Sequence, residues 1–243
     1  MQIETFAVLI LIGRPAAGKS EFIEYLKSIE KYRRMQRFHI GDFEVIDNFP
    51  ILWSWLEEDC ILSDMGKPRL HTTQNGYFNE SYLWDLLIRR ICLKYKKRIE
   101  KNPRYHEKFT SIIEFSRGKE HGGYALAFDQ LSSQILNAAA VFYIRVSWEE
   151  SLRKNRRRFN PQRPDSILEH SLPDEKMKRL YRECDWDSVS APDPDYLHVG
   201  SIKVPYAVLE NDDDVTTKGE EVLGRRLETV LSRLWELYKI RKL

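Results

Sequence analysis

The feature of this chain that most constrains its fold is a glycine-rich motif near the N-terminus. Residues 13–20 read Gly-Arg-Pro-Ala-Ala-Gly-Lys-Ser, which fits the pattern G-x-x-x-x-G-K-[ST]. An uninterrupted apolar run, Phe6 to Ile12, precedes the motif and is typical of a buried parallel strand. Apolar residues then recur at helical spacing, at Phe22, Ile23, Leu26 and Ile29. Strand, glycine loop and helix in this order predict a phosphate-binding loop.

The residue types of this motif suit the binding of a nucleoside triphosphate. The glycines let backbone N–H groups wrap a polyphosphate, and the start of the next helix adds a positive dipole end and unpaired donors. We expect Lys19 to reach the β- and γ-phosphates and the Ser20 hydroxyl to ligate Mg²⁺. ATP and Mg²⁺ are therefore the predicted cofactors. The predicted nucleotide contacts in the loop are Gly13, Arg14, Pro15, Ala16, Ala17, Gly18, Lys19 and Ser20.

The composition indicates a compact enzyme rather than a membrane protein. The chain has 243 residues, 42% hydrophobic and 31% charged, which suffices for one sizeable core. No apolar stretch reaches the length of a membrane span and the N-terminus lacks a secretory signal pattern, so we expect a cytoplasmic protein. The net charge of +2 argues against a nucleic-acid partner. The sequence leaves the oligomeric state open, a homodimer included.

Cysteine and histidine spacing gives no sign of disulfide or transition-metal chemistry. Cys60, Cys92 and Cys184 stand far apart without a C-x-x-C pair, so we expect reduced thiols. The six histidines form no H-E-x-x-H pattern and no Cys/His ligand spacing. Any metal is therefore expected to be a hard cation held by oxygen atoms.

Apolar runs predict an α/β fold, a parallel sheet whose strands alternate with helices and which two polar inserts interrupt. The expected strands are Phe6–Ile12, Arg37–Ile40, Ser111–Phe115, Ala138–Val146 and Tyr206–Leu209. Ligands of such sheets bind at the carboxyl ends of the strands. We expect one domain, residues 1–243. Its core is about 1–47, 110–155 and 202–243, with a substrate-binding insert at about 48–109 and a lid with its following helix at about 156–201.

Capping residues and apolar periodicity predict where further helices begin and end. Two capping boxes mark helix starts, Ser147 with Glu150 and Thr217 with Glu220. Inside the inserts we expect a periodic helix from Tyr82 to about Ile99 and another near Pro173 to Cys184, capped by Ser171. The aromatic residues of the first insert are expected chiefly to form its core, at Trp53, Tyr77, Phe78, Tyr82 and Trp84.

In the order of its elements, the chain resembles the P-loop nucleoside and nucleoside-monophosphate kinases. The segment 39–42, His-Ile-Gly-Asp, is similar to the stretch after their second strand, where a Gly-Asp pair opens the acceptor site. The segment 112–117, Ile-Ile-Glu-Phe-Ser-Arg, is similar to the element after their third strand. In those kinases the acidic residue of this element lies near the magnesium shell or the acceptor, and the arginine holds phosphate. The resemblance implies a three-layer α/β/α fold with a five-stranded parallel sheet of order 2-3-1-4-5.

The second half of the chain carries the same resemblance. Val141 to Val146, the helix after it and the arginines that follow look like the lid that closes over ATP. Val204 to Asp214 resembles the last strand and the loop that borders adenine, which adds Asn211 to the predicted cofactor contacts.

Phosphoryl transfer requires positive charge around the moving phosphate, and arginine's planar fork suits phosphate oxygens. A basic cluster follows the fourth predicted strand, at Arg153, Lys154, Arg156, Arg157, Arg158 and Arg163. We select Arg153 and Arg157 as catalytic lid residues. The alternatives are a solvated basic helix face and a small nucleic-acid patch.

An acceptor hydroxyl needs a carboxylate to orient it or take its proton. We expect Asp42 in this role and Glu114 as catalytic residue and metal ligand beside Ser20, with Arg117 on an acceptor phosphate. Glu44 and Asp47 are the fallback carboxylates and are otherwise expected to be solvated.

The predicted activity is an ATP- and Mg²⁺-dependent transfer of the γ-phosphate to a small molecule, a nucleoside, nucleotide or similar metabolite. The alternative is a P-loop ATPase or a nucleotide-dependent switch or binding protein without such transfer. The segment 210–214, Glu-Asn-Asp-Asp-Asp, does not supply the Asn-Lys-x-Asp of common GTPases. The third strand also lacks the aspartate after four apolar residues that motor ATPases usually carry, which favours the kinase.

Overall fold

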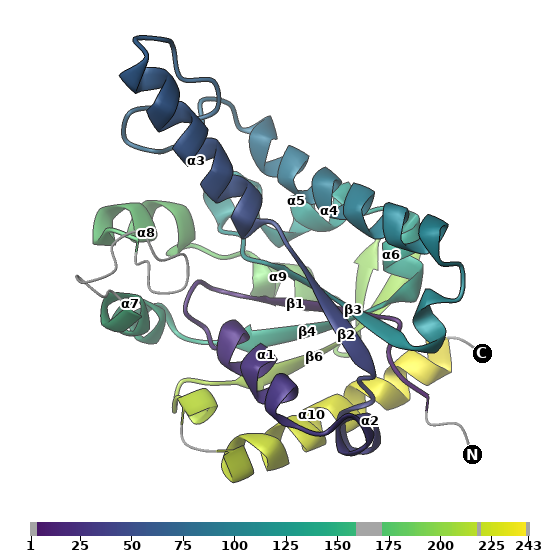
Figure 1. Ribbon diagram of the computed structural model, residues 1–243. Coiled ribbons are helices and arrows are strands. Elements are labelled where there is room, and N and C mark those ends of the chain that lie inside the picture. The colour runs from purple at the N-terminus through teal and green to yellow at the C-terminus, as the bar shows by residue number, and fades with distance from the viewer. Residues whose placement is uncertain (1–3, 159–171, 218–219, 242–243) are drawn as a thin grey trace.

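The computed structural model describes residues 4–158, 172–217 and 220–241. In this part of the chain one sheet carries helices on both faces (Figure 1). The strands are β1 (Val8–Gly13), β2 (Asp42–Asp47), β3 (Phe109–Phe115), β4 (Ala139–Arg145), β5 (Tyr196–Val199) and β6 (Ile202–Glu210). The helices are α1 (Lys19–Ser28), α2 (Lys31–Phe38), α3 (Phe49–Asp64), α4 (Tyr82–Lys101), α5 (Gly123–Gln130), α6 (Ser133–Ala138), α7 (Trp148–Arg158), α8 (Asp174–Tyr181), α9 (Trp186–Ser190) and α10 (Glu220–Arg241).

The sheet is mixed and mostly parallel, with the strand order β2-β3-β1-β4-β6-β5. Every pairing is parallel except that of β5 with β6. The predicted five-stranded sheet of order 2-3-1-4-5 is therefore wrong in count and in order, because the described residues include β5 as a sixth strand at one edge. This four-residue strand is too short for a clear sequence signal. It turns back onto β6 through Gly200, whose φ of 57° is a conformation that glycine adopts without strain.

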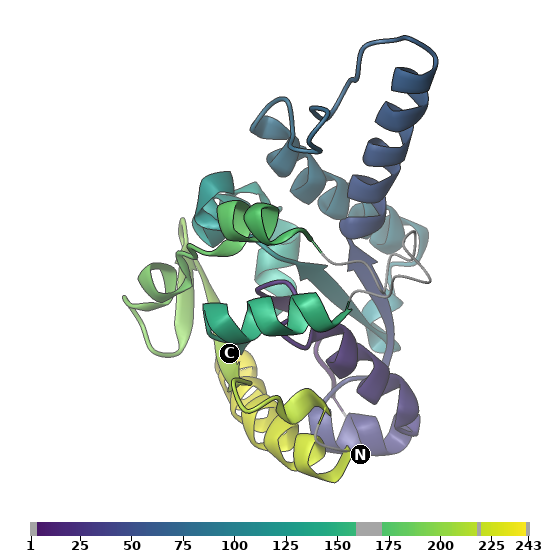
Figure 2. The ribbon, with the colours of Figure 1, turned by 90° about the vertical axis from the view of Figure 1, so that its left-hand side faces the viewer.

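Alternate side chains of the strands pack against different helices. Leu9 and Leu11 of β1 lie in a cluster with α1, α2 and α10, whereas Val8, Ile10 and Ile12 lie in a cluster with α4, α5, α6 and α9. Figure 2, turned by 90°, shows α10 on one side of the sheet and α4 on the other. The α/β prediction is confirmed, and the period of two along each buried strand produces the two cores.

The second strand lies later in the sequence than predicted. Arg37 and Phe38 end helix α2 rather than beginning a strand, and β2 starts only at Asp42. The helix is favoured because Glu30 accepts hydrogen bonds from two backbone N–H groups of its first turn, and because Phe38 is fully buried on its inner face. The predicted strand Arg37–Ile40 is therefore wrong.

Other predicted helices are confirmed within a few residues. The periodic segment of the first insert forms α4, and the helix of the second insert forms α8. The Ser147 hydroxyl accepts a hydrogen bond from the N–H of Glu150 at 3.3 Å, as expected at the start of α7. The predicted cap Ser171 and the opening of the predicted lid lie outside the described residues, as do two residues of the Thr217–Glu220 box. No helix among the described residues is long and apolar enough to cross a membrane.

Candidate functional site

The loop between β1 and α1 has a backbone that depends on its glycines. Gly18 has a φ of 109°, and a Cβ atom there would come within 2.8 Å of the Asn211 amide nitrogen and the Thr216 side chain. At Gly13 a Cβ atom would come within 2.6 Å of the Ile144 carbonyl oxygen of β4. Both positions therefore require glycine, for reasons of space at each and of conformation at Gly18.

The side chain of Asn211 supports this loop through hydrogen bonds. It is fully buried, and its amide nitrogen donates to the Ala17 carbonyl at 2.7 Å and to the Thr216 hydroxyl at 3.0 Å. Its amide oxygen accepts from the Thr216 N–H at 3.2 Å. The predicted nucleotide contact of Asn211 does not agree with this placement, because both polar atoms are used inside the protein. Asn211 is a positioning residue that acts through the loop.

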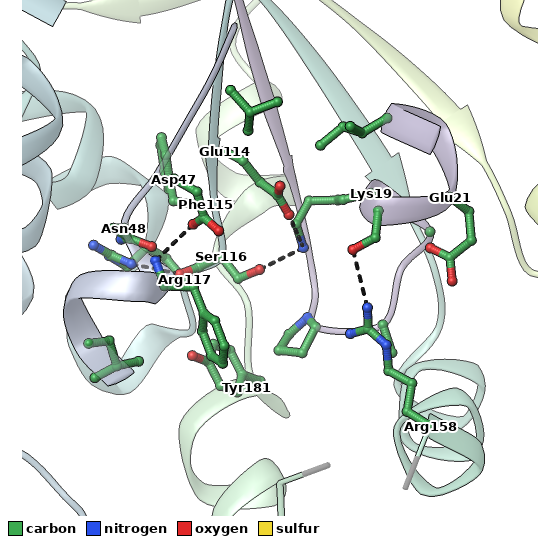
Figure 3. Close-up of a pocket in the computed structure, with 18 of the residues that line it drawn as sticks. Lys19, Glu21, Asp47, Asn48, Glu114, Phe115, Ser116, Arg117, Arg158 and Tyr181 are labelled. Atoms are coloured by element: carbon green, nitrogen blue, oxygen red, sulfur yellow. Dashed lines mark hydrogen bonds and ion pairs between the residues drawn. The ribbon is translucent and has the colours of Figure 1, made fainter. Parts of the chain in front are cut away.

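Lys19, the first residue of α1, is held at the carboxyl end of the sheet (Figure 3). Its Nζ donates to the Ser116 hydroxyl at 2.8 Å and to the Arg14 carbonyl at 3.1 Å, and lies 4.0 Å from Glu114 Oε1. The side chain is 8% exposed. Burial lowers the pKa of Lys19 from its usual value, while the charge of Glu114 opposes that change. The ammonium group is thus fixed by dipoles and by one carboxyl group rather than by solvent.

Two carboxyl groups on neighbouring strands face Lys19. Asp47 ends β2, Glu114 lies near the end of β3, and the two residues are register partners. Both line the same cavity (Figure 3). Burial raises the pKa of Glu114 to about 7, with Lys19 opposing the change and Asp47 adding to it. Burial also raises the pKa of Asp47. The site therefore holds a carboxyl group that titrates near neutral pH.

Asp42 lies at the other end of β2, so its predicted place at this site is wrong. Its carboxylate pairs with Lys31 at 2.6 Å and with Arg34 at 3.7 Å. The fallback residue Glu44 is also engaged elsewhere, since it accepts from the Tyr105 hydroxyl at 3.0 Å and pairs with Arg98 at 3.0 Å. The physical reason is the position of β2. A strand that starts at residue 42 carries Asp47, rather than Asp42, to its carboxyl end.

These groups open into a cavity of about 320 Å³. One side of it is formed by the glycine loop and α1. The other side is formed by apolar and aromatic side chains of the first insert, at Phe49, Leu52, Trp84 and Leu87. A cavity with one charged side and one apolar side suits a ligand that combines phosphates with a ring.

Arg117 enters the same cavity from the segment after β3 (Figure 3). It is 3% exposed, donates to the Ser116 and Trp84 carbonyl oxygens at 2.8 and 3.1 Å, and lies 5.2 Å from the centre of the Trp84 ring. Burial lowers the pKa of Arg117 to about 10. The guanidinium is therefore charged at neutral pH and already oriented, as an anion site requires.

The arginine of α7 that reaches the glycine loop is Arg158. One of its terminal nitrogens donates to the Ser20 hydroxyl at 3.2 Å. Arg153 instead pairs with Glu150 and Asp214, and Arg157 is exposed. Neither of these two lines the cavity, so their predicted role as catalytic lid residues stays a prediction, while Arg158 is the arginine of α7 that the structure places at the cavity. The sequence identified the basic cluster but not the rotation of α7, which decides which side chain faces inward.

The oxygen atoms at the site fit a hard cation such as Mg²⁺. Ser20 offers a hydroxyl, and Asp47 and Glu114 offer carboxylates, around one cavity. Among the described residues no three His, Cys, Asp or Glu side chains are grouped to hold a metal alone. Mg²⁺ is usually bound by one or two carboxylates together with substrate phosphates and water, so this sparse donor set fits the ion.

The comparisons with known proteins leave the site to be judged on its geometry. No family model matches the chain, and no curated protein matches it. A solved structure described as "Crystal structure of APE1195" is similar over 95% of this chain and 99% of its own, with a TM-score of 0.40 and 14% sequence identity. A similarity this weak supports no conclusion about function.

Proposed function

We propose that this chain is an ATP- and Mg²⁺-dependent phosphotransferase that moves the γ-phosphate to a small-molecule acceptor, a nucleoside, nucleotide or similar metabolite. The observation that carries the proposal is the placement of Lys19. It follows the glycine loop and lies 4.0 Å from Glu114, in a cavity with an apolar, aromatic far side. A helix N-terminus and a buried lysine bind a polyphosphate, and the far side leaves room for the acceptor.

The residues of the glycine loop bind the triphosphate in this proposal. The loop N–H groups hold phosphate oxygens, and Lys19 neutralises charge on the transferring group. Arg158 adds charge from α7 when ATP is bound, because its guanidinium already lies within reach of Ser20. Mg²⁺, held by Ser20 and by a carboxylate directly or through water, neutralises further charge on the phosphates.

Asp47 replaces Asp42 as the proposed base. It lines the cavity at the end of β2, next to the aromatic side where an acceptor would lie. The acceptor hydroxyl oxygen attacks the γ-phosphorus, the bond to the ADP oxygen breaks, and the hydroxyl proton passes to the Asp47 carboxylate. Glu114, nearer to Lys19, is assigned to the metal.

The acceptor specificity is proposed to depend on Trp84 and Arg117. The indole supplies a flat apolar wall, and the guanidinium supplies a fixed positive charge. An acceptor that already carries a phosphate would use both groups.

An ADP-release assay tests the proposal. We expect purified protein with ATP and Mg²⁺ to release ADP rapidly only when the correct compound is added from a panel of nucleosides, nucleotides, sugars and vitamin precursors. Release that needs no acceptor and responds to protein or nucleic acid would instead support the ATPase or switch alternative.

Three variants then test the assignments. Lys19→Ala should lower turnover about 10²-fold or more, the range for a major electrostatic contact. Asp47→Asn should lower transfer about 10²-fold while ATP still binds, as for a general base. Asp42→Asn is the matched control on the same strand and should retain turnover. Equal losses in Asp42→Asn and Asp47→Asn would contradict the assignment of the base.

A further inference from the structure

Asn48 is a buried asparagine at the junction of β2 and α3. It follows Asp47 in the chain, lines the cavity and is 7% exposed. Its amide nitrogen has no hydrogen-bond partner among the described residues. A buried amide donor that stays unpaired lowers the stability of a folded protein, so such a group in the wall of a cavity calls for an explanation.

Capping of α3 does not account for this side chain. Asn48 occupies the N-cap position, which asparagine favours, yet its side chain makes no capping hydrogen bond. Asp47 takes that role, since its Oδ1 accepts from the Phe49 N–H at 2.8 Å. The Asn48 amide is therefore not explained by the start of the helix.

A second asparagine of the cavity shows how a structural amide is bound. Asn155 of α7 is 4% exposed, and its amide nitrogen donates to the Leu172 carbonyl oxygen at 2.8 Å. Its amide oxygen accepts from the Leu172 N–H at 3.2 Å. Asn155 thus joins two segments of the chain, whereas the nitrogen of Asn48, at similar burial, joins none of the described residues.

The Asn48 amide can turn its nitrogen toward the cavity. Rotation about the Cβ–Cγ bond exchanges the positions of the amide nitrogen and oxygen, and this torsion is broad and two-fold rather than fixed. The nitrogen loses no hydrogen bond in the rotation, because it has none among the described residues. A ligand in the cavity can therefore accept a hydrogen bond from this amide.

Arg117 indicates which kind of ligand group would accept that hydrogen bond. Its guanidinium is 3% exposed and donates to two backbone carbonyl oxygens, those of Ser116 and Trp84. Among the described residues no carboxylate forms an ion pair with it, and a buried charge without a partner is costly. An anionic group on the ligand would supply the missing partner.

Asn48 and Arg117 lie beyond the same end of the sheet. β2 and β3 are parallel neighbours in which Asp47 is the register partner of Glu114, so the residues after each strand reach the same end. Both side chains line the cavity, and Figure 3 shows them on the side away from Lys19. An anion held here is therefore distinct from a phosphate held by the glycine loop.

We propose that Asn48 is a specificity-determining residue, whose amide N–H donates to a phosphate monoester that the acceptor already carries and that Arg117 neutralises. A phosphate has enough oxygen lone pairs to accept from both side chains at once. A neutral nucleoside or sugar leaves both groups unpaired, which discriminates strongly against it. The acceptor is then a hydroxyl compound with a phosphate, and its hydroxyl lies at Asp47. The place of the hydroxyl rests on the proposed function, whereas the anion site does not.

Urea unfolding of the free protein tests the amide without any substrate. Asn48→Leu keeps the branched shape of the side chain but removes the unpaired donor, so it should unfold at the urea concentration of wild type or at a higher one. Asn155→Leu is the matched control and should unfold at a lower concentration, because it removes two hydrogen bonds. A lower midpoint in Asn48→Leu as well would show a structural amide and overturn the inference.

Ribose 5-phosphate and ribose are the probes for the anion site. Calorimetry is done with Mg²⁺ and ADP at saturation, so that the glycine loop is already filled. Wild type should bind ribose 5-phosphate more tightly than ribose, and Asn48→Leu should weaken the binding of ribose 5-phosphate about tenfold or more, the range for a hydrogen bond to a charged group. Asn48→Asp should weaken it further through repulsion. Equal affinity of wild type for both probes, or equal affinity of wild type and Asn48→Leu for ribose 5-phosphate, would contradict the proposal.

Turnover separates this inference from the proposed function. With the acceptor found in the ADP-release panel, Asn48→Leu should raise the KM of that acceptor about tenfold or more and leave the KM of ATP unchanged. Rapid transfer only to compounds without a phosphate would overturn the inference and leave the phosphotransferase standing. Absence of transfer to every acceptor would contradict the proposed function, while the unfolding measurements would still decide the role of the Asn48 amide.

Discussion

Replacing Glu114 by glutamine should change how the stability of the protein depends on pH. The Glu114 side chain is 16% exposed, and burial raises its pKa from 4.5 to about 7. The folded state therefore holds this proton more tightly than the unfolded state does. The stabilisation is fully present below pH 4.5, where both states are protonated, and is lost as the pH rises through about 7.

The size of the effect follows from the two pKa values. One pKa unit is worth 1.36 kcal/mol, so the difference between 4.5 and about 7 corresponds to about 3 kcal/mol. This value is an upper limit, because Asp47 and Lys19 readjust when Glu114 changes. Glu114→Gln is neutral at every pH and resembles the protonated acid. Wild type and variant should thus be equally stable near pH 4.5, and the variant should be the more stable by up to about 3 kcal/mol at pH 8.

Urea unfolding followed by tryptophan fluorescence, at steps between pH 4.5 and 8, measures this difference. The slope of free energy against urea should be the same for both proteins, so that midpoints can be compared. Glu58→Gln, an exposed residue on α3, is the control and should follow wild type throughout. Parallel curves for wild type and Glu114→Gln would refute the link between burial and proton affinity at this site.

Four further predictions concern the glycine loop and the arginines around it. Asn211→Leu leaves a loop carbonyl oxygen without its donor and should lower the free energy of unfolding by about 1–3 kcal/mol, measured by urea unfolding. Gly18→Ala should weaken ATP binding by calorimetry while the circular dichroism spectrum stays that of wild type, because φ is 109° and the new Cβ has no space. Arg158→Gln should lower turnover more than Arg157→Gln, and equal effects would show that the contact with Ser20 has no role. Arg117→Ala should impair transfer to phosphorylated acceptors more than to unphosphorylated ones, as kcat/KM for each would show, and an equal loss would assign Arg117 to structure alone.

The elements around the glycine loop could be predicted from short stretches of sequence. An apolar run, two glycines, a lysine and a helical apolar pattern predicted a strand at residues 6–12, a loop and a helix reaching Ile29. The structure has the strand at Val8–Gly13 and the helix at Lys19–Ser28. The positive φ of Gly18 is a property of a short stretch of backbone, so a local glycine pattern indicates it, whereas the close approach of Ile144, Asn211 and Thr216 to the loop is known only from the structure. A local pattern also indicates α4, whose period of 3.6 residues appears in its sequence.

Which acidic residue of β2 supplies a carboxylate to the site could be decided only from the tertiary structure. Asp42, Glu44 and Asp47 are all acidic residues near one strand, and their types do not distinguish them. Pairing of β2 with β3 puts Asp47 opposite Glu114 and leaves Asp42 at the far end. That register depends on residues more than sixty positions away in the chain, which no local pattern contains.

The sequence by itself determined the residue types at this site, the α/β class and the places of the helices α1, α4, α7, α8 and α10, because these follow from side-chain period and turn chemistry over short stretches. Only the tertiary structure decided which residues of the acidic and basic clusters come together at the site. Arg158 rather than Arg153 reaches the loop through the rotation of α7, and β5 joins the sheet edge through its pairing with β6. Rotation and pairing are set by packing between distant segments, where a shift of one residue moves a side chain to another face.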